Sequence, residues 1–384
     1  MRLAAATIAS KSHLAHARVL AASFREHHPE IPFFVLLADE IEGAFEPEHE
    51  PFALVLLRQL TIRDLRGFTF RYTEQELSYA AAPYLIEHLL DSGFDAVAFF
   101  KQESLVSAPL RHVLALVERH SIVLTPHLLH PVGARRELAI LQSGVYNSGF
   151  LAVANRAQGR AFLEWWKDRL ERHCVHDVPN GIHFEQRWLD LVPAYFDDYG
   201  FVHDPRFNVA HWNLLERQTV DPCFIRFSGY DPKQPHRTTR YVARPSMAEI
   251  GDAAAWFAEY ARRLTEAGDD ECRTWPYAYA HFDDGEPVPD AARTAYRLLA
   301  PPLDPWSGES RLWFARYEKE RHSLRSLAQR AVKVWKRRRA EKGTWYAMRV
   351  VAAATWKHVA AAIAATVSRT PGGSRGSRAT RGLV

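Results

Sequence analysis

The stretch DAVAFFKQES, residues 95–104, joins an apolar run to charged side chains. Residues 95–100 read as a strand, and Lys101 and Glu103 follow it directly. A short, continuous apolar run of this kind predicts a strand that is buried on both faces of a sheet. In α/β folds ligands bind beyond the carboxyl ends of such strands. Lys101 and Glu103 are therefore candidate ligand contacts.

Apolar, β-branched runs alternate with helical patterns on both sides of this stretch. We predict strands at 3–9, 32–39, 95–100 and 121–127, and helices at 13–28, 77–90 and 110–120. Residues 145–227 mix short strands with helices, and helices dominate from Pro245 to about Ala300. This alternation predicts an α/β fold with a mostly parallel sheet flanked by helices. One edge of that sheet would gather residues 7–11, 39–40 and 101–103.

The composition is that of a globular protein: 384 residues, 47% hydrophobic and 24% charged. We see no signal-peptide pattern at the start and no apolar run of about 18 residues, so we expect no spanning helix. Three scattered cysteines, Cys174, Cys223 and Cys272, predict neither a disulfide framework nor a zinc site. We expect a cytoplasmic protein.

Charge divides the chain into an acidic body and a basic tail. Residues 321–384 hold fifteen Lys or Arg and one acid, Glu341, which leaves 34 basic and 44 acidic residues in 1–320. We predict one domain over 1–320, a basic amphipathic helical tail over 321–370 and a disordered end over 371–384. The tail suits an anionic membrane surface, packing on the acidic body, or non-specific attraction to nucleic acid, for which we find no recognition motif.

Several segments together resemble bacterial glycosyltransferases of the GT-A fold, the nucleotide-diphospho-sugar transferases. They include HARVLAASFREHHPEIPFFVLLAD, AVAFFKQESLVSAPL, GVYNSGFLAVAN, GIHFEQRWLDLVP, FNVAHWNL and FIRFSGYDP. The resemblance covers roughly 1–320 and leaves the basic tail outside. It implies a GT-A-type, Rossmann-like sheet with a C-terminal helical extension, a nucleotide-sugar donor, and a carbohydrate or lipid-linked acceptor.

The likeness also implies a metal site that this chain has altered. In the family the segment FFKQES carries the DxD motif, two aspartates that hold a divalent cation against the donor diphosphate. Lys101 and Glu103 stand at those positions, and Arg226 stands where a histidine commonly completes the site. We therefore expect Lys101, Arg226 and Glu103 to bind the diphosphate without metal, with Glu103 orienting the two cations. A surface ion pair between Lys101 and Glu103 is the alternative. If the alignment is wrong, Mn²⁺ or Mg²⁺ would bind instead.

The resemblance assigns roles to further positions. Where relatives have Lys-Pro and Asp-Gln, this chain has Ala82-Pro83 and Glu185-Gln186. The implied catalytic residues are Asn147, Glu185 and Gln186. The implied nucleotide contacts are Thr7 and Lys11. The implied acceptor or sugar contacts are Asn208, Trp212, Asn213, Ser228 and Gly229. For Trp212 we place packing in the core ahead of a sugar contact, and for Trp165 and Trp166 we expect packing in the core. We treat His127 and His130 as structural.

We predict a glycosyltransferase that acts on a carbohydrate or glycoconjugate acceptor, either free in the cytoplasm or peripheral on the inner face of the membrane. One alternative is a non-catalytic protein that binds glycans or nucleotides on a decayed transferase scaffold. The other is hydrolysis of nucleotide sugars without an acceptor.

Overall fold

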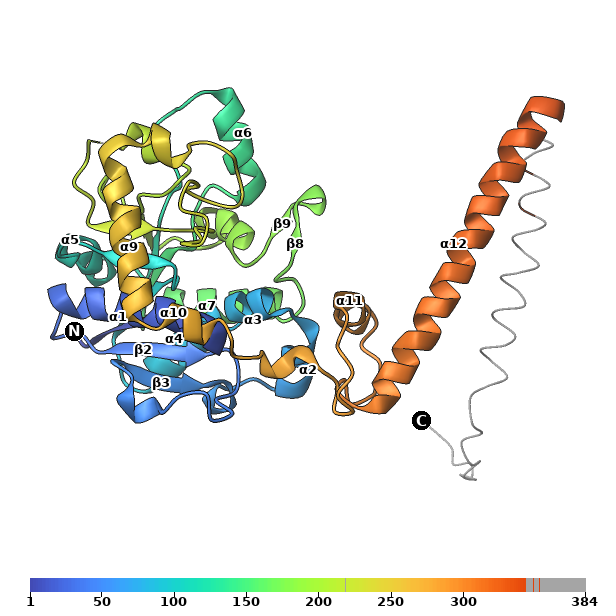
Figure 1. Ribbon diagram of the computed structural model, residues 1–384, viewed down its shortest axis with the longest axis horizontal. Helices are drawn as coiled ribbons and strands as arrows, with labels where there is room; N and C mark the ends of the chain where they lie inside the picture. The colour runs from blue at the N-terminus through green and yellow to red at the C-terminus, as the bar shows by residue number, and fades with distance from the viewer. Residues whose placement is uncertain (218, 343–347, 349–351, 353–384) are drawn as a thin grey trace, which may run out of the picture. The chain divides into compact units, whose positions relative to one another are not determined.

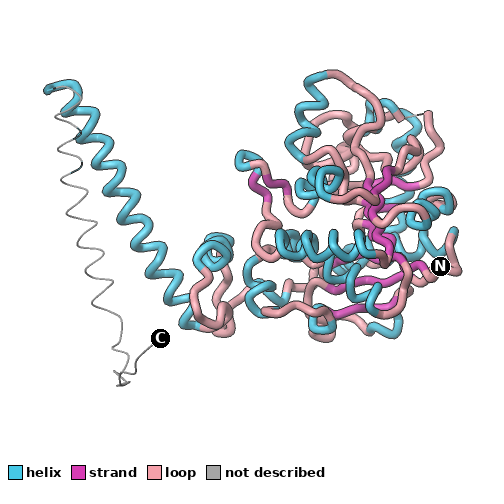
Figure 2. The backbone as a smooth tube through the Cα atoms, turned by 180° about the vertical axis from the view of Figure 1, so that it is seen from behind, coloured by secondary structure: helices cyan, strands magenta, loops and turns pink. Residues whose placement is uncertain are grey.

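A computed structural model of the chain describes residues 1–217, 219–342, 348 and 352. The described chain divides into two units at Arg311 and Leu312. The first unit is an α/β fold built on a seven-stranded sheet with the order β10-β6-β7-β4-β1-β2-β3. The sheet passes through the middle of that unit in Figures 1 and 2. Only β7 runs antiparallel to its neighbours in this sheet.

The strands are short and mostly apolar. Those of the large sheet are β1 (Leu3–Ala9), β2 (Phe33–Leu37), β3 (Ala53–Leu56), β4 (Ala96–Phe100), β6 (Ile122–Leu124), β7 (Phe150–Ala154) and β10 (Tyr199–Phe201). Two antiparallel pairs lie outside it: β5 (Ser104–Val106) with β11 (Phe224–Arg226), and β8 (His176–Asp177) with β9 (Ile182–His183).

Helices cover both faces of the large sheet. The α-helices of the first unit are α1 (Leu14–His27), α2 (Leu65–Arg71), α3 (Glu74–Ala80), α4 (Ala82–Asp91), α5 (Arg111–Leu114), α6 (Ala134–Ser143), α7 (Ala157–Leu170), α8 (Val192–Tyr195), α9 (Ala254–Glu266), α10 (Asp269–Cys272) and α11 (Asp290–Leu299). Short 3₁₀ turns connect several of them, among them Lys11–His13 after β1 and Gln186–Leu191 before α8.

Alternate side chains of β1 belong to two separate cores because successive residues of a strand point to opposite faces. Ala5 and Ala9 pack with α1, α5 and α9, whereas Ala4, Ala6 and Ile8 pack with α3, α4 and α7. All five residues of β4 are buried, because helices cover the sheet on both sides. This explains why residues 96–100 read as an unbroken apolar run.

The structure confirms the predicted α/β class, with a mostly parallel sheet flanked by helices. Each predicted strand is present, with ends shortened by up to a few residues. The predicted helix over 77–90 is wrong as a single element: α3 ends at Ala80, and α4 begins at Ala82 with Pro83 in its first turn. Proline fits the first turn of a helix because its missing N–H needs no partner there. The predicted helix over 110–120 is also divided, into α5 and a 3₁₀ turn.

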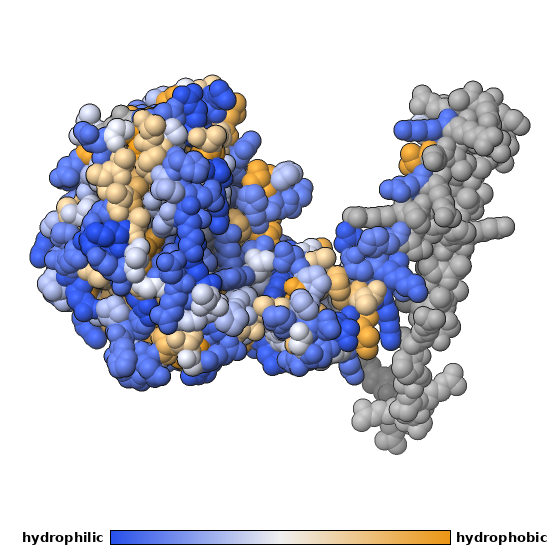
Figure 3. All heavy atoms as spheres, viewed as in Figure 1, coloured by the Kyte–Doolittle hydropathy of each residue, from blue (hydrophilic) through white to orange (hydrophobic). Residues whose placement is uncertain are grey.

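The long helix α12 (Gly308–Lys342) contains the first part of the predicted basic tail. The remainder of the tail up to 370, apart from Met348 and Ala352, and the predicted disorder of 371–384 lie outside the described residues. Within the described part of the chain, no helix combines the length and the hydropathy needed to cross a bilayer. On the face of the first unit seen in Figure 3, polar residues dominate and hydrophobic ones form small groups.

Candidate active site

The carboxyl ends of β1 and β4 define the candidate site. These strands are parallel neighbours, with Ala6 opposite Phe99, so the residues that follow them reach the same edge of the sheet. Because β7 is antiparallel to β4, the segment that precedes β7 also reaches this edge, and the Lys101 N–H donates to the Gly149 carbonyl (3.0 Å). The sheet thus brings Lys101 and the predicted residue Asn147 together, although they are far apart in sequence.

Lys101 is held by a buried carboxylate. Its Nζ lies 2.5 Å from Glu185 Oε1, and the two side chains are 11% and 2% exposed. The same ammonium group lies 3.6 Å from the centre of the Tyr79 ring, a cation–π contact. Burial lowers the pKa of Lys101, and Glu185 opposes that shift. The ammonium charge is therefore already balanced inside the protein.

Glu185 keeps one oxygen free. Oε1 accepts the ion pair and a hydrogen bond from Ser148 Oγ (2.5 Å), whereas Oε2 is buried with no hydrogen-bond partner in the described structure. Buried polar atoms without a partner are uncommon and call for a specific explanation. A carboxylate that is oriented on one side and open on the other can act on a bound ligand.

Asn147 and Gln186 use their amide groups within the protein. Asn147 Nδ2 donates to Gln186 Oε1 (3.0 Å) and to His127 Nε2 (3.1 Å), and Asn147 Oδ1 accepts from the Gly149 N–H (3.0 Å). Gln186 Oε1 also accepts from Ser148, and Gln186 Nε2 donates to the Ser143 carbonyl. Both side chains are buried, so we assign them to positioning Ser148 and Glu185.

His127 belongs to the same network as a neutral ring. Burial lowers its pKa to about 3, and Asn147 donates to its Nε2. Both observations agree with the predicted structural role. His130 is exposed.

Arg226 is the second cation of the site, and it lacks a carboxylate partner among the described residues. It ends β11, where the β5–β11 register places it opposite Ser104. One terminal nitrogen donates to Ser104 Oγ (3.2 Å), and Nε has no partner in the part of the chain that the structure describes. Burial lowers the pKa of Arg226, while Glu103 acts in the opposite direction. Arg226 is therefore buried with its charge largely uncompensated.

Gly149 permits this arrangement because it has no side chain. A Cβ at this position would lie 2.3 Å from Asn147 Oδ1 and 2.7 Å from Arg226 Nε, closer than real contacts allow. Only glycine therefore lets Arg226 approach the Asn147 segment. The Lys101–Glu185 pair and Arg226 are thus parts of one site.

Glu103 does not occupy the position that the sequence suggested. We expected its carboxylate to orient both cations, and a surface Lys101–Glu103 ion pair was the alternative. The structure contradicts both pairings for Lys101, because its ammonium group pairs with Glu185. Glu103 instead fixes the loop after β11: its carbonyl accepts from the Phe227 N–H (2.8 Å), and its carboxylate accepts weakly from the Gly229 N–H (3.4 Å).

The residues present do not fit a divalent cation at the position that the resemblance implies. Hard cations take several oxygen ligands, and two of the three expected ligand positions carry Lys101 and Arg226. At another place in the protein, His112, Asp204 and Cys223 each offer one potential ligand atom, and these three atoms lie within 4.8 Å of one another. Arg206 already pairs with Asp204, and burial raises the pKa of Cys223 to about 12, which disfavours a thiolate ligand.

The predicted nucleotide contacts are both buried. Thr7 lies inside β1, and its hydroxyl has no hydrogen-bond partner within the described chain. The Lys11 ammonium group, 1% exposed, pairs with Glu42 and lies 3.9 Å from Asp39. Burial raises the pKa of Asp39 to about 6, although it accepts hydrogen bonds from several backbone N–H groups. Lys11 thus stabilises the edge of the sheet and is not presented to a ribose.

Some of the predicted acceptor residues form hydrogen bonds within the protein, and others keep hydrogen-bonding groups without a partner among the described residues. The Asn213 side-chain amide forms hydrogen bonds with backbone groups of Ala210, His127 and Asn208. Asn208 is buried at a positive φ of 58°. Among the described residues, neither polar atom of the Asn208 side chain has a hydrogen-bond partner, and the Nε1 of half-buried Trp212 has none either. Trp166 is buried and Trp165 is half-buried in the core, as predicted.

Ser228 and Gly229 belong to the loop after β11. The Ser228 carbonyl accepts from Thr239 Oγ1, and Gly229 has a positive φ of 70°. A Cβ at Gly229 would lie 2.5 Å from the Tyr241 ring, so this position also favours glycine.

Several residues of the site were not predicted from the sequence. Tyr79 holds Lys101, Ser148 holds Glu185, and Glu74 lies at the start of the same helix as Tyr79. The pattern Thr73-x-x-Glu76 is a capping box and could have located the start of α3. No local signal shows which residue of α3 faces Lys101, because that depends on tertiary packing.

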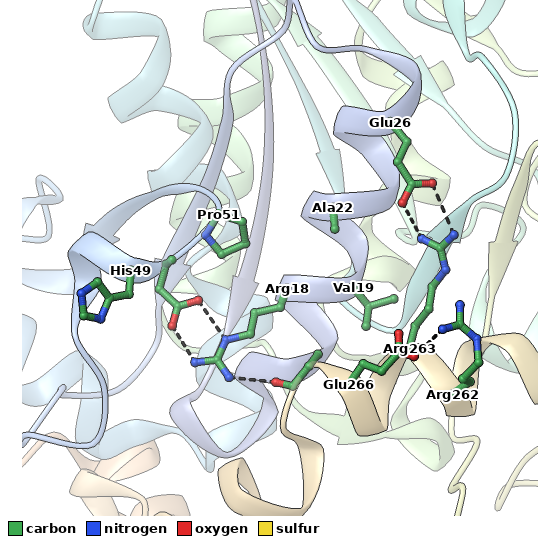
Figure 4. Close-up of a pocket in the computed structure, with 11 residues that line it drawn as sticks. Arg18, Val19, Ala22, Glu26, His49, Pro51, Arg262, Arg263 and Glu266 are labelled. Atoms are coloured by element: carbon green, nitrogen blue, oxygen red, sulfur yellow. Dashed lines mark hydrogen bonds and ion pairs between the residues drawn. The ribbon is translucent and has the colours of Figure 1, made fainter.

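Two open hollows lie outside the candidate site. One, of about 510 Å³, lies between α1, α9 and residues 49–51 (Figure 4). Its arginines are matched by acids: Arg18 pairs with Glu50, and Arg263 with Glu26. A second hollow, of about 710 Å³, includes Met1 and Leu3 and therefore lies at the amino end of β1, opposite the candidate site. Neither hollow contains an unpaired buried charge comparable to Arg226.

No family model matches the chain. An uncharacterised protein of Bacillus subtilis (strain 168), YfnF, is 24% identical over 277 residues, which cover 62% of this chain and 88% of YfnF. Solved structures similar to this chain include those of glycosyltransferases. The galactosyltransferase LgtC, in complex with donor and acceptor sugar analogues, is 17% identical and matches 69% of this chain and 96% of its own, with a TM-score of 0.39. The glycosyltransferase GlyE of Streptococcus pneumoniae TIGR4 is 12% identical and matches 73% of this chain and 66% of its own, with a TM-score of 0.43.

Proposed function

We propose that this chain is a glycosyltransferase of the GT-A type that moves a sugar from a nucleoside-diphosphate donor to a carbohydrate or glycoconjugate acceptor without a divalent cation. One observation carries the proposal: an uncompensated buried cation, Arg226, shares a site with Glu185, a buried carboxylate that has one free oxygen. The sequence segments that resemble GT-A transferases support the same reaction class.

Arg226 supplies the charge that the leaving group requires. When the sugar–phosphate bond breaks, its electron pair stays on the diphosphate, and negative charge grows there. A guanidinium group can donate two parallel hydrogen bonds to phosphate oxygens, and its attraction to them is stronger in a buried site than in water. The free Nε of Arg226 is a suitable donor.

Lys101 and Glu185 form a pair that the donor can rearrange. Together with Arg226 and Glu103 they sum to zero charge, so the site is neutral before the donor enters. An entering diphosphate attracts the Lys101 ammonium group and weakens its hold on Glu185. The freed carboxylate then lies near the sugar, where it stabilises the positive charge that develops on the reacting carbon. The acceptor hydroxyl oxygen forms the new bond to that carbon, and its proton passes to an oxygen of the departing diphosphate.

Turnover of a defined donor tests the proposal. The purified chain should release UDP, GDP or dTDP from one class of nucleotide sugar, faster when a glycan acceptor is present, and the acceptor should gain the mass of one sugar. Glu185→Ala should abolish this turnover, whereas Glu266→Ala, a surface change on α9, should leave it unchanged.

The rival functions predict different products. Release of nucleotide without any gain of mass by an acceptor would identify a hydrolase. Tight nucleotide binding without turnover of any donor would favour the non-catalytic scaffold and overturn the proposal.

We further propose that the basic tail brings this site to an anionic membrane surface that carries lipid-linked acceptors. Between 321 and 342 the chain holds nine Lys or Arg and one acid. Basic segments of this kind bind anionic lipids by charge. The full chain should sediment with phosphatidylserine vesicles, whereas a chain ending at 320 should stay in solution. Equal sedimentation of the two chains would overturn the proposed role of the tail.

A further inference from the structure

His13 is held on one side by a cluster of polar groups at the carboxyl end of β1. Its Nδ1 lies 3.0 Å from Ser10 Oγ and 2.8 Å from Ser12 Oγ, and Ser12 Oγ donates to Glu74 Oε1 (2.6 Å). Glu74 Oε1 is itself 3.5 Å from His13 Nδ1. A carboxylate and two hydroxyls therefore fix the orientation of the ring, as in histidines that bind ligands or transfer protons.

The other side of His13 is open. Nε2 has no hydrogen-bond partner among the described residues, and the side chain is 45% exposed. A structural histidine of this protein looks different: the buried His16 uses Nδ1 on the Tyr260 hydroxyl, and burial lowers its pKa to about 3. His13 is thus an oriented ring with a free donor.

The position of His13 places this donor beside the candidate site. Residues 10–13 follow β1, and Lys101 and Glu103 follow the neighbouring strand β4. Helix α3 contributes to both places, with Glu74 on His13 at its start and Tyr79 on Lys101 near its end. Glu103 lies close enough to act on the charge of both His13 and Arg226.

We propose that His13 is a third cation of the site and donates from Nε2 to a phosphate group of the nucleoside-diphosphate donor. This inference rests on the proposed function. The reason is charge: the formal charges of Lys101, Arg226, Glu103 and Glu185 sum to zero, whereas a diphosphate brings about two negative charges. Arg240, the other cation near Glu103, is exposed, so solvent screens its charge.

The groups that face His13 favour its charged form. Burial acts to lower the pKa of His13, but the hydrogen bond and charge of Glu74 on α3 and the charge of Glu103 after β4 outweigh it and raise the pKa. Arg273, which follows α10, acts against them. The imidazolium ion is present below the raised pKa, so phosphate binding should weaken as the pH rises through that value.

Calorimetric titration with UDP, GDP and dTDP from about pH 6.5 to pH 9 tests this role. For the nucleotide that binds, the wild-type affinity should fall about tenfold over this range, which is the loss of one charge-assisted hydrogen bond. His13→Gln should bind about tenfold more weakly at the lower pH and lose most of the pH dependence. His13→Lys keeps the charge at every pH, so it should bind well with a flat profile. His27→Gln, at the far end of α1, should match the wild type.

The outcomes separate this inference from the proposed function. If the wild type binds a nucleotide and His13→Gln keeps both its affinity and its pH profile, the role of His13 is overturned and the proposed function stands. If no nucleotide binds at any pH, the proposed function fails and the inference fails with it. Thermal unfolding of each variant shows whether the fold is retained, and His13→Lys distinguishes loss of charge from loss of structure.

Discussion

Lys101 and Arg226 are two cations of one site in opposite electrostatic states. The Lys101 ammonium group has a carboxylate at 2.5 Å and an aromatic ring at 3.6 Å. Within the described residues, the Arg226 guanidinium group has a single hydroxyl contact, at 3.2 Å, and its Nε has no partner. In the sequence they look equivalent, because both replace residues that would hold a metal in the resembling family. The structure shows that one is neutralised in advance and the other is not.

This difference means that the free-energy penalty of burying the charge is not the same for the two side chains. Removing a charge from water is expensive, and a nearby opposite charge with good geometry offsets most of the penalty. Glu185 provides that compensation for Lys101, whereas Arg226 has no carboxylate partner among the described residues. The unpaired cation is therefore the one that an anionic ligand stabilises most, and the paired cation is the one on which folding depends.

The largest expected effect is on stability. Lys101→Met leaves Glu185 buried without its partner and should lower the free energy of unfolding by about 3–5 kcal/mol. Arg226→Met removes an uncompensated buried charge and should leave that free energy unchanged or raise it. Urea denaturation of both variants measures the difference. Lys101→Met combined with Glu185→Leu should recover most of the loss.

Equal destabilisation by Lys101→Met and Arg226→Met would remove the distinction between the two cations. Failure of the double variant to recover stability would show that the ion pair is not the cause of the loss. The double-variant comparison is needed because methionine also changes packing.

The next effect is on phosphate binding. Arg226→Met should weaken binding of the preferred nucleoside diphosphate about 100-fold, because loss of a buried charge pair costs about 2–5 kcal/mol. The affinity of Arg226→Lys should lie between those of the wild type and Arg226→Met, since an ammonium group keeps the charge but cannot donate two parallel hydrogen bonds as a guanidinium group does. Calorimetry gives both values. The affinity for the corresponding nucleoside, which has no phosphate, should not change, and an equal loss for the nucleoside would point to a collapsed pocket instead.

Much of the fold is visible in the sequence because its strands are buried on both faces. The runs at 3–9 and 95–100 are long, apolar and bounded, and the structure has strands at Leu3–Ala9 and Ala96–Phe100. The strand β3 was not predicted: it has only four residues, of which Val55 is buried and Ala53 is exposed, so the run is short and its burial is uneven. Pro83 was recognised as an irregularity, but its place in the first turn of a new helix was not.

The site was only partly predictable, for a related reason. The strand end predicts Lys101 at the site, and the resemblance to GT-A transferases implies Asn147, Glu185 and Arg226 there; the structure brings the four together. Pairing is a property of tertiary geometry, so nothing in the sequence shows that Lys101 takes Glu185 and not Glu103. The sequence also does not show that the amide groups of Asn147 and Gln186 already have hydrogen-bond partners, because these partners come from distant segments.

A smaller effect tests whether the paired cation can change partners. Glu185→Gln removes one negative charge and frees Lys101, so the affinity for nucleoside diphosphate should rise about tenfold, the effect of one charge at close range. Transfer should fall at least about 100-fold if Glu185 stabilises the reacting carbon. Calorimetry and initial rates on the same preparation measure both quantities. Weaker binding would mean that Lys101 does not move to the phosphate, and unchanged transfer would remove Glu185 from the mechanism.

The smallest expected effect is that of metal removal. Arg226 and a released Lys101 supply the counter-charge from the protein itself, so excess EDTA should change the affinity for nucleoside diphosphate by less than about twofold, and added Mn²⁺ should not raise it further. Arg226→Ala supplies the positive control: a site that has lost its fixed cation should bind more tightly when Mn²⁺ is added, because the metal can then bridge the phosphates. If EDTA instead abolishes binding to the wild type, the substitution of cations for metal ligands is wrong, and Lys101 remains in the site only as the partner that keeps Glu185 in place.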